Sequence, residues 1–383
     1  MARRTTRRFV TQWVPDMIVT RPSASPRWTK CALAPTMTAR VGERPAGDEA
    51  REGTCAAWVA EQVLSGRFAA AGVMIGQVHP NGWTVDDEMA GHVQDYVDMI
   101  QARGGDIEAE RRVALTPEIA GTFDAGAYLS DTATLHIDDL KYGRRPVKPT
   151  SPQLVIYAAA MMRELRGSSI PVRRVVTGIY QPRAFVSGGP YLTHDWSPED
   201  LEQRAQWIIE RAADCRAPNP VATPGPHCLY CDGAGRGCDS LASTAPQVMA
   251  IVQDTDHDDM SPAALARQLE FYRWASDVIK AAADGAETEA IARHKAGDTL
   301  PGYGLTERMG QTKVTTTRAA IQALTGVELP VKEKPPAVGD LRKAGLTDAQ
   351  MALFTTRPSI GWKLEKLDAD ALRRQFTGVP NND

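Results

Sequence analysis

Hydrophobic and polar residues change their period along the chain, and each period predicts a different kind of element. Residues 49–66 and 84–102 carry the pattern of helices, and the second segment places its apolar residues on one helix face. Residues 110–115, 119–129 and 133–143 are shorter, strand-like segments separated by turn residues. The pattern therefore predicts two helices followed by three β-strands.

A serine followed directly by a proline predicts the start of three further helices, at Ser151, Ser197 and Ser261. A serine cap and a proline in the first turn are both favoured at a helix N-terminus. Between the first two of these helices, residues 172–180 are expected to form another strand. This order of elements predicts an α/β fold in which helices pack on a hairpin-rich mixed sheet.

Composition narrows the class of protein. The chain has 383 residues, of which 43% are hydrophobic, and a net charge of -3. The length suits one catalytic domain with a smaller appended region, and the charge argues against a uniformly basic DNA-binding protein. No apolar run is long enough to cross a bilayer, and the basic start of the chain lacks the apolar segment of a secretory signal. We therefore expect an intracellular protein that makes no use of the membrane.

Two local clusters of basic residues are candidates for contact with nucleic acid. One is the arginine-rich segment at residues 3–8, for which a solvated arm is the alternative interpretation. The other consists of Lys141, Arg144, Arg145 and Lys148 and lies beside the motif that carries the strongest chemical signal. We expect the second cluster to be the functional one.

An aspartate and a lysine two residues apart end the strand-like segment 133–143. Strand alternation puts Asp139 and Lys141 on a face that begins apolar. Asp138 belongs to the opposite face and is expected to be solvated. Hairpin pairing with the preceding strand, in GTFDAG, would bring Asp124 beside Asp139.

Two neighbouring carboxylates repel each other unless a cation lies between them, and hard oxygen ligands suit Mg²⁺ or Mn²⁺. Lys141 would then orient a water molecule or stabilise charge that develops on a phosphate group. A buried Asp–Lys ion pair without a catalytic task is the alternative for Asp139 and Lys141 alone. The presence of Asp124 in the preceding strand favours the metal site.

The motifs GTFDAG, IDDLKYG and QLVIY together resemble motifs II and III and the downstream QxxxY of RecB-like PD-(D/E)XK nucleases. The resemblance implies a restriction-endonuclease-like core, in which helices flank a mixed central sheet. It implies that Asp124 and Asp139 bind the metal and that Lys141 is catalytic. It also implies that Gln153 and Tyr157 support the site or contact DNA.

Two further acids are weaker candidates for the metal site. Glu110 matches an acid often found on the first strand of the nucleases that the chain resembles. Those nucleases usually carry a metal-binding histidine on their first helix, where this chain has Ala57. Glu61 lies one turn later on the same helix face and is either a ligand or an ordinary helix acid. The missing imidazole keeps open a second function, that of a catalytically weak or inactive DNA-binding or scaffold protein.

More narrowly, the chain resembles an uncharacterised phage and prophage branch of the same superfamily over about residues 22–305. The ordered motifs are SASPRWTKC, EGTCAAW, ERRVAL, GTFDAG, DDLKYG, QLVIYA and PHCLYC. This resemblance implies an exonuclease of phage-type DNA recombination or end processing, which acts on linear ends or single strands. A bacterial cytoplasm and a phage recombination or replication protein as partner follow from it as expectations.

Three of the six cysteines, Cys228, Cys231 and Cys238, are clustered in a Pro- and Gly-rich loop with metal-binding spacing. The fourth ligand of such a site would be either His227, in a zinc site, or Cys31. In iron–sulfur nucleases related to RecB, one cysteine before the catalytic core joins three after it around a [4Fe–4S] cluster, and these four cysteines match that layout. Zinc in an interaction module without nuclease ancestry, and free thiols, are the alternatives.

These observations divide the chain into three expected parts. Residues 1–21 are a basic N-terminal arm, residues 22–245 are the nuclease domain with its cysteine set, and residues 246–383 are a helical and mixed extension of unknown role. The remaining cysteines, Cys55 and Cys215, are expected to be small buried residues.

Overall fold

The computed structural model describes most of the chain, which divides into two compact units, Met1–Ala286 and Glu287–Asp383. The described residues are 20–184, 188–253, 261–309, 313–314, 318–328, 341, 344–356 and 359–366. The arginine-rich segment at residues 3–8 lies outside them. Within the described part of the chain, no helix has the length and apolar character needed to cross a membrane.

The first unit is built on a five-stranded sheet in the order β1-β2-β3-β4-β5. The strands are β1 (Asp106–Thr116), β2 (Ile119–Leu129), β3 (Thr134–Leu140), β4 (Arg174–Tyr180) and β5 (Tyr191–Trp196). β3 and β4 are parallel, and the other neighbours are antiparallel. The mixed sheet confirms the expected α/β class. The edge strand β5 was not predicted, because its polar residues lack an apolar face.

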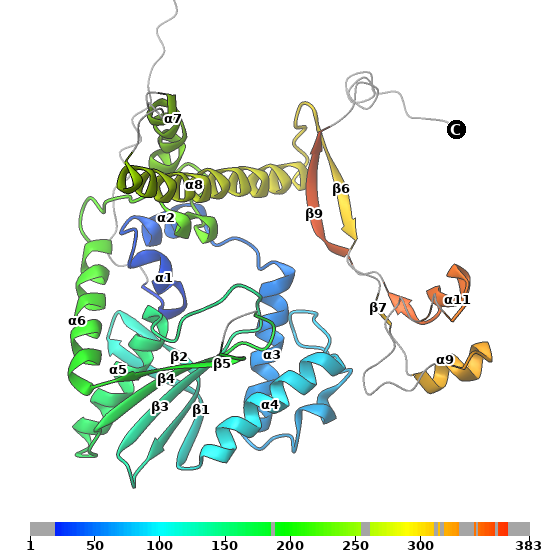
Figure 1. Cartoon of the computed structure of the whole chain (residues 1–383), viewed down its shortest axis with the longest axis horizontal. Coiled ribbons are helices and arrows are strands. Elements are labelled where there is room, and N and C mark those ends of the chain that lie inside the picture. Colours follow the sequence, from blue (N-terminus) through cyan, green and yellow to red (C-terminus); the bar gives the residue numbers. More distant parts are fainter. Residues whose placement is uncertain are drawn as a thin grey trace, which may run out of the picture. The chain divides into compact units, whose positions relative to one another are not determined.

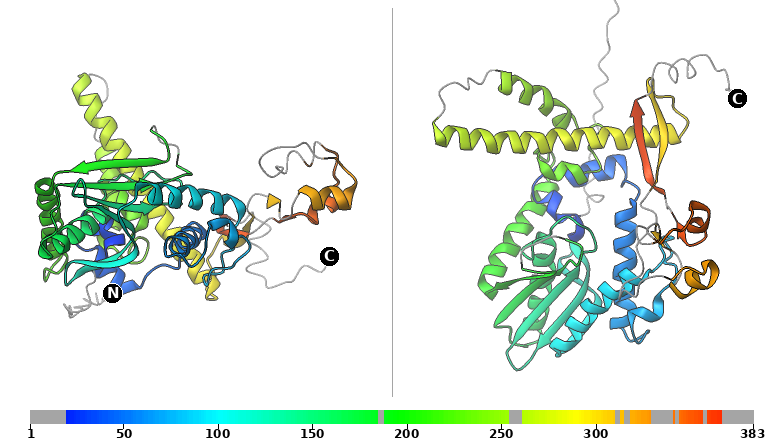
Figure 2. Two further views of the ribbon diagram at one scale, coloured as in Figure 1. Left: turned by 90° about the horizontal axis from the view of Figure 1, so that it is seen from below. Right: turned by 45° about the vertical axis from the view of Figure 1, so that its right-hand side comes forward.

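Helices cover both faces of this sheet (Figures 1 and 2). α3 (Asp48–Leu64) and α4 (Asp87–Arg103) form one apolar core with the sheet, and α5 (Pro152–Gly167) and α6 (Pro198–Cys215) form another. The predicted serine caps are present, since Ser151 and Ser197 accept hydrogen bonds from backbone N–H groups of the first turn. The parallel step from β3 to β4 runs through α5, as a crossover between parallel strands requires.

The other elements of the first unit are η2 (Pro22–Ala24), α1 (Ser25–Trp28), α2 (Ala34–Val41), η3 (Ala71–Met74), η4 (Pro226–Tyr230), α7 (Asp239–Gln253) and the long α8 (Pro262–Lys295), which continues into the second unit. Cys31, between α1 and α2, packs in one apolar cluster with Cys228 and Cys231. The N-terminal segment is therefore fixed against the cysteine loop.

The second unit has two small sheets. β6 (Tyr303–Met309) pairs with β9 (Ser359–Lys366), and β7 (Lys313–Val314) pairs with β8 (Thr355–Thr356). Its helices include α9 (Arg318–Thr325) and α11 (Asp348–Ala352). The unit has a small apolar core of its own, which includes Ile321, Leu341 and Phe354.

Candidate functional site

Three carboxylates lie in one row across strands β1, β2 and β3. The register pairs Ala109 with Ala125 and Ala125 with Asp138. One position further along each strand, Glu110, Asp124 and Asp139 occupy the same row. Glu110 has a left-handed backbone with φ of 48°, which is uncommon for a residue with a side chain. The regular pairing of β1 with β2 is therefore interrupted at Glu110, beside the two aspartates.

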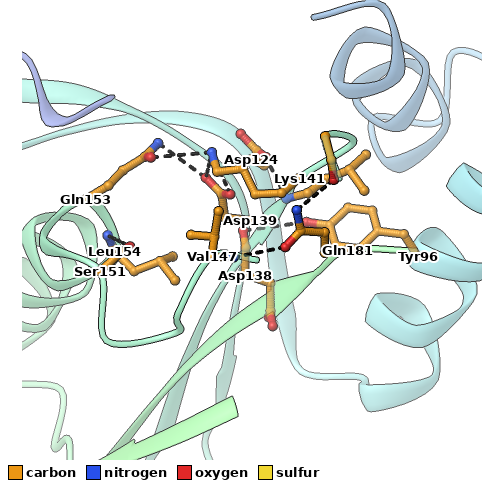
Figure 3. Close-up of polar contacts among 12 residues, drawn as sticks. Tyr96, Asp124, Asp138, Asp139, Lys141, Val147, Ser151, Gln153, Leu154 and Gln181 are labelled. Carbon is orange, nitrogen blue, oxygen red and sulfur yellow. Dashed lines mark hydrogen bonds and ion pairs between the residues drawn. The ribbon is translucent and has the colours of Figure 1, made fainter. Parts of the chain in front are cut away.

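Asp139 is the centre of a polar cluster on the α5 side of the sheet (Figure 3). It is 1% exposed, and its Oδ1 accepts hydrogen bonds from Lys141 Nζ at 3.0 Å and from Gln153 Nε2 at 3.2 Å. Its Oδ2 lies 2.8 Å from Lys141 Nζ but accepts no well-oriented hydrogen bond from the described residues. A buried carboxylate oxygen without such a partner is uncommon and is suited to a cation.

Asp124 faces Asp139 from the neighbouring strand. Its Oδ2 accepts a hydrogen bond from the backbone N–H of Leu140 at 2.9 Å. Burial, and then the negative charge of Asp139, raise the pKa of Asp124 to about 8. Burial, followed by the charges of Glu61 and Asp139, raises the pKa of Glu110 to about 7. These carboxylates therefore hold more negative charge than the site accommodates without a cation.

Lys141 supplies the ammonium group of this cluster. Burial alone would lower its pKa, but Asp139 and Asp124 outweigh that effect and raise it. Lys141 continues the alignment of β3 with β4, since its backbone N–H donates to Tyr180 O at 2.9 Å. Its Nζ also donates to Gln153 Oε1 at 3.3 Å. The ammonium group is charged and held between two neighbouring groups.

The structure brings Gln153 directly into the cluster and Tyr157 next to it. Both lie on α5, where the cap at Ser151 fixes the start of the helix. Tyr157 is buried and packs on Phe123, with 6.4 Å between the ring centroids. Burial raises the pKa of Tyr157 to about 12, so that its hydroxyl keeps its proton. Gln153 orients Asp139 and Lys141 through its hydrogen bonds, whereas Tyr157 packs beside them as part of the apolar core.

Glu61, on α3, lies close enough to the cluster for its negative charge to raise the pKa of Glu110. Its carboxylate also lies 3.3 Å from Arg67 Nη1. Ala57 lies one turn earlier on the same helix and is half-buried. Glu61 therefore brings a carboxylate toward the site, and Ala57 has only a methyl group where the resemblance implies a histidine.

The expectation that Asp138 is solvated is wrong. Asp138 is 1% exposed, because α4 covers the sheet face that the alternation pattern left open. Its carboxylate pairs with Arg103 and accepts a hydrogen bond from the Tyr191 hydroxyl at 2.6 Å. Gly178 leaves room for this carboxylate, since a Cβ there would lie 2.1 Å from Asp138 Oδ1. Arg103 and Tyr191 were not recognised in the sequence, since neither belongs to a motif.

One small cavity of about 20 Å³ is lined by four free cysteines. They are Cys31, Cys228, Cys231 and Cys238. Backbone N–H groups point at two of the sulfurs, from Thr223 to Cys31 Sγ and from Gly225 to Cys228 Sγ, both at 3.4 Å. Such donors stabilise a thiolate. His227 also borders the cavity, but its Nε2 lies 2.9 Å from the Thr223 carbonyl oxygen and is engaged there. Cys55 and Cys215 lie elsewhere and are fully buried.

No group of three or more His, Cys, Asp or Glu side chains in the described part of the chain is arranged to hold a metal ion as it stands. The fit of each centre to a metal therefore depends on its donor set. The carboxylate row offers hard oxygen ligands and a buried oxygen without a hydrogen bond. The cysteine cavity is lined by four sulfurs, the donor type of iron–sulfur and zinc sites. Both donor sets fit the groups that the sequence predicts.

Comparison with known proteins gives one family and a distant structural likeness. The model of the family described as "Protein of unknown function (DUF2800)" matches residues 19–335. Among solved structures, a crystal structure of a presumed exonuclease from Eubacterium rectale is similar at 9% sequence identity and a TM-score of 0.34. That alignment covers 58% of this chain and 90% of the other.

Proposed function

This chain belongs to the family described as protein of unknown function (DUF2800), and we propose that it is a divalent-metal-dependent DNA nuclease. The observation that carries the proposal is the buried Asp139 carboxylate, whose Oδ1 accepts hydrogen bonds from Lys141 and Gln153 and whose Oδ2 lies 2.8 Å from Lys141 Nζ without a well-oriented hydrogen bond. The acids Asp124 and Glu110 stand in the same row. An ion pair without a task would not need three aligned carboxylates.

Each residue of the cluster has a separate role in phosphodiester hydrolysis. Asp139 and Asp124 would hold Mg²⁺ or Mn²⁺, with Glu110 and Glu61 as further acids at the edge. When bound, the ion supplies a Lewis acid for the phosphate and lowers the pKa of water. Lys141 donates hydrogen bonds from a fixed position to the attacking water or to the phosphate oxygen that gains charge. Gln153 holds the Lys141 ammonium group in place.

The proposed action at DNA ends follows from the resemblance to RecB-like nucleases. We propose an exonuclease of phage-type recombination or DNA end processing, working on DNA in the cytoplasm of a bacterial host beside a phage recombination or replication protein. An exonuclease requires a DNA end, so it degrades linear DNA and spares a covalently closed circle.

The cysteine set is proposed to bind a [4Fe–4S] cluster. Cys31 precedes the catalytic core and the other three follow it, so the bound group would close a loop around the whole core. By analogy with a disulfide across a long loop, such a closure stabilises the fold by roughly 4–5 kcal/mol. Visible absorbance and iron content of anaerobically purified protein test this role. Both should be lost in Cys231→Ser and kept in the control Cys55→Ser, while bound zinc without iron would contradict it.

Ala57 supports a second candidate function, in which the fold binds DNA but cleaves it slowly or not at all. The variant Ala57→His separates the two functions. A large gain in cleavage identifies a weakened nuclease, whereas the absence of cleavage from both proteins favours a binding or scaffold role.

Degradation of end-labelled linear DNA, with a circular DNA of the same sequence, tests the proposed function. We expect cleavage of the linear form with Mg²⁺ or Mn²⁺, and its loss in Asp139→Ala and Lys141→Ala. Asp131→Asn is a matched control, because Asp131 is an exposed acid in the turn between β2 and β3. Equal cleavage by the control and by Asp139→Ala would rule out the assignment.

A further inference from the structure

The loop that follows Lys141 is held rigidly by one buried side chain. Gln181 is 3% exposed, and its Nε2 donates to the carbonyl oxygens of Gly143 and Arg145, both at 2.7 Å. Its Oε1 accepts from the backbone N–H of Val147 at 3.0 Å (Figure 3). All three of these hydrogen bonds of the Gln181 amide are made to this loop. The backbone at Arg145 therefore has a fixed position relative to β4.

This rigid loop presents three exposed cations, Arg144, Arg145 and Lys148. None of them pairs with a carboxylate in the part of the chain that the structure describes. Half-buried arginines of the same unit differ, since Arg103 and Arg183 each have a carboxylate partner. Exposed cations that stand on a fixed backbone and lack a neighbouring carboxylate are suited to binding a polyanionic partner.

Arg145 does have one neighbour, an aromatic ring from the cysteine loop. Its guanidinium carbon lies 5.5 Å from the centroid of the Tyr230 ring. Tyr230 is 55% exposed, although the cysteines on either side of it, Cys228 and Cys231, are buried. The Tyr230 carbonyl oxygen accepts a hydrogen bond from Arg27, so the loop is fixed at this residue. Two segments far apart in sequence thus present an arginine and an aromatic ring as one surface.

We propose that Arg145 and Tyr230 form a binding site for an unpaired DNA strand, with Arg144 and Lys148 contacting its phosphates. The inference rests on the proposed nuclease function, because it names the form of DNA that the site receives. The Tyr230 ring stacks on a base, and the planar guanidinium of Arg145, which lies over the ring, adds a cation–π contact. The site selects single strands, since a base pair inside a duplex does not expose its face to a side chain.

The position of this site in the chain links strand binding to both centres of the molecule. Arg145 follows the catalytic lysine by four residues, and Tyr230 lies between two cysteines of the proposed cluster site. A strand that rests on Tyr230 therefore runs beside the loop that leaves the carboxylate row.

Binding of a labelled oligothymidine to the full chain in EDTA tests the inference, because no cleavage is needed for the readout. We expect Tyr230→Leu to weaken binding by about 5- to 150-fold, the effect of one lost base stack. Tyr230→Phe, which keeps the ring, should bind as the parent protein does. A blunt duplex of the same length should be affected little by either change.

Arginine variants keep the test valid if the cysteine loop does not tolerate leucine. Arg145→Ala should weaken the binding of the single strand, and Arg145→Lys should restore only part of it, because lysine keeps the charge but not the planar group. Arg174→Ala is the control for charge, since Arg174 is exposed but paired with Asp195 on another edge. Arg144→Ala and Lys148→Ala should each reduce the salt dependence of single-strand binding, by about 0.7 in the logarithmic slope.

Three results would overturn the inference. They are unchanged binding in Tyr230→Leu and Arg145→Ala, an equal loss in Tyr230→Phe and Tyr230→Leu, or an equal loss for the duplex and the single strand. Failure of the proposed nuclease function is distinguishable, since it appears as absent cleavage with strand binding intact. Cleavage with unchanged binding in the variants would instead reject the strand site alone.

Discussion

The two faces of strand β3 treat neighbouring aspartates in opposite ways. Asp138 and Asp139 are each 1% exposed. On the α4 side, Asp138 meets an arginine and a tyrosine hydroxyl, so its charge is balanced within the protein. On the α5 side, Asp139 shares one lysine with a second carboxylate and keeps an oxygen without a hydrogen bond. Burial is the same, but only one of the two sites is electrostatically complete.

This difference in charge balance distinguishes Asp138, a structural carboxylate, from Asp139, a carboxylate suited to bind a cation. A buried charge that is fully paired contributes to a defined fold, and removing its partner is costly. A buried charge that remains incompletely paired costs stability in the isolated protein and is retained where a cation compensates it. The comparison predicts that changes on the α4 side mainly affect stability, whereas changes on the α5 side mainly affect activity.

The largest expected effect is the loss of the ion pair on the α4 side. Arg103→Met leaves the Asp138 charge buried without its cationic partner, which should lower the free energy of unfolding by about 3–5 kcal/mol. Denaturant unfolding measures this change. Cleavage per folded molecule should remain close to that of the parent protein, and a stability loss below about 1 kcal/mol would refute the structural role of this pair.

The corresponding change on the α5 side should have the opposite profile. Asp139→Asn removes a metal ligand and should lower the cleavage rate by about 100- to 1,000-fold, as the loss of one electrostatic contact in an active site does. Stability without metal should stay the same or rise, because Asp124 no longer faces a like charge. Rate measurements and thermal unfolding on the same sample check both halves, and a large loss of stability with normal activity would reverse the assignment.

The Asp138 error shows which part of the fold was accessible from the sequence. Periodicity located α3, α4, the first four strands and the acid–lysine face, because each of these repeats an apolar pattern, and the Ser–Pro pairs located the starts of α5, α6 and α8. The pattern could not tell that α4 covers the second face of β3, since that contact joins residues 35 apart, Arg103 and Asp138. The contact between Arg145 and Tyr230 was inaccessible for the same reason.

The same limit applies to the candidate site. Asp124, Asp139 and Lys141 could be inferred from strand alternation and hairpin pairing, and Gln153 from the resemblance. Gln181 could not, because its three hydrogen bonds are made to backbone groups, which carry no sequence signal. Side chains that support a site through backbone contacts become visible only in three dimensions.

A smaller effect is expected where the α4-side cluster touches β4. In Gly178→Ala the new methyl group would meet Asp138 Oδ1 at 2.1 Å and the Tyr191 hydroxyl at 2.7 Å. Overpacking of this kind typically costs about 1–3 kcal/mol. Gly143→Ala is a suitable control, since a Cβ at Gly143 would have no other atom within 4 Å and the φ of this residue is not positive. Equal stability of the two variants would indicate that the Asp138 cluster is loose.

A further expected effect on the α5 side is a pH dependence of the free energy of unfolding. Burial and Asp139 raise the pKa of Asp124 from 3.8 to about 8, so the folded state keeps a proton that the unfolded chain releases. The free energy of unfolding without metal should therefore fall as the pH rises from about 4 to about 8. Glu110, with its pKa raised to about 7, acts in the same direction.

Thermal unfolding in EDTA at several pH values measures this slope. Asp124→Asn should flatten it, and Mg²⁺ should restore stability most at the alkaline end, where the carboxylates are ionised. A slope that is unchanged in Asp124→Asn would assign the pH dependence to other groups.

Direct titration with Mn²⁺ tests the central claim, that the carboxylates on the α5 side of β3 hold a divalent ion. Calorimetry on the parent protein, Asp139→Asn and Asp138→Asn, each corrected for its folded fraction, compares the two faces in one experiment. The account predicts Mn²⁺ binding that is weakened by more than about 100-fold in Asp139→Asn and by far less in Asp138→Asn. Equal Mn²⁺ affinity in the parent protein and in Asp139→Asn would contradict it.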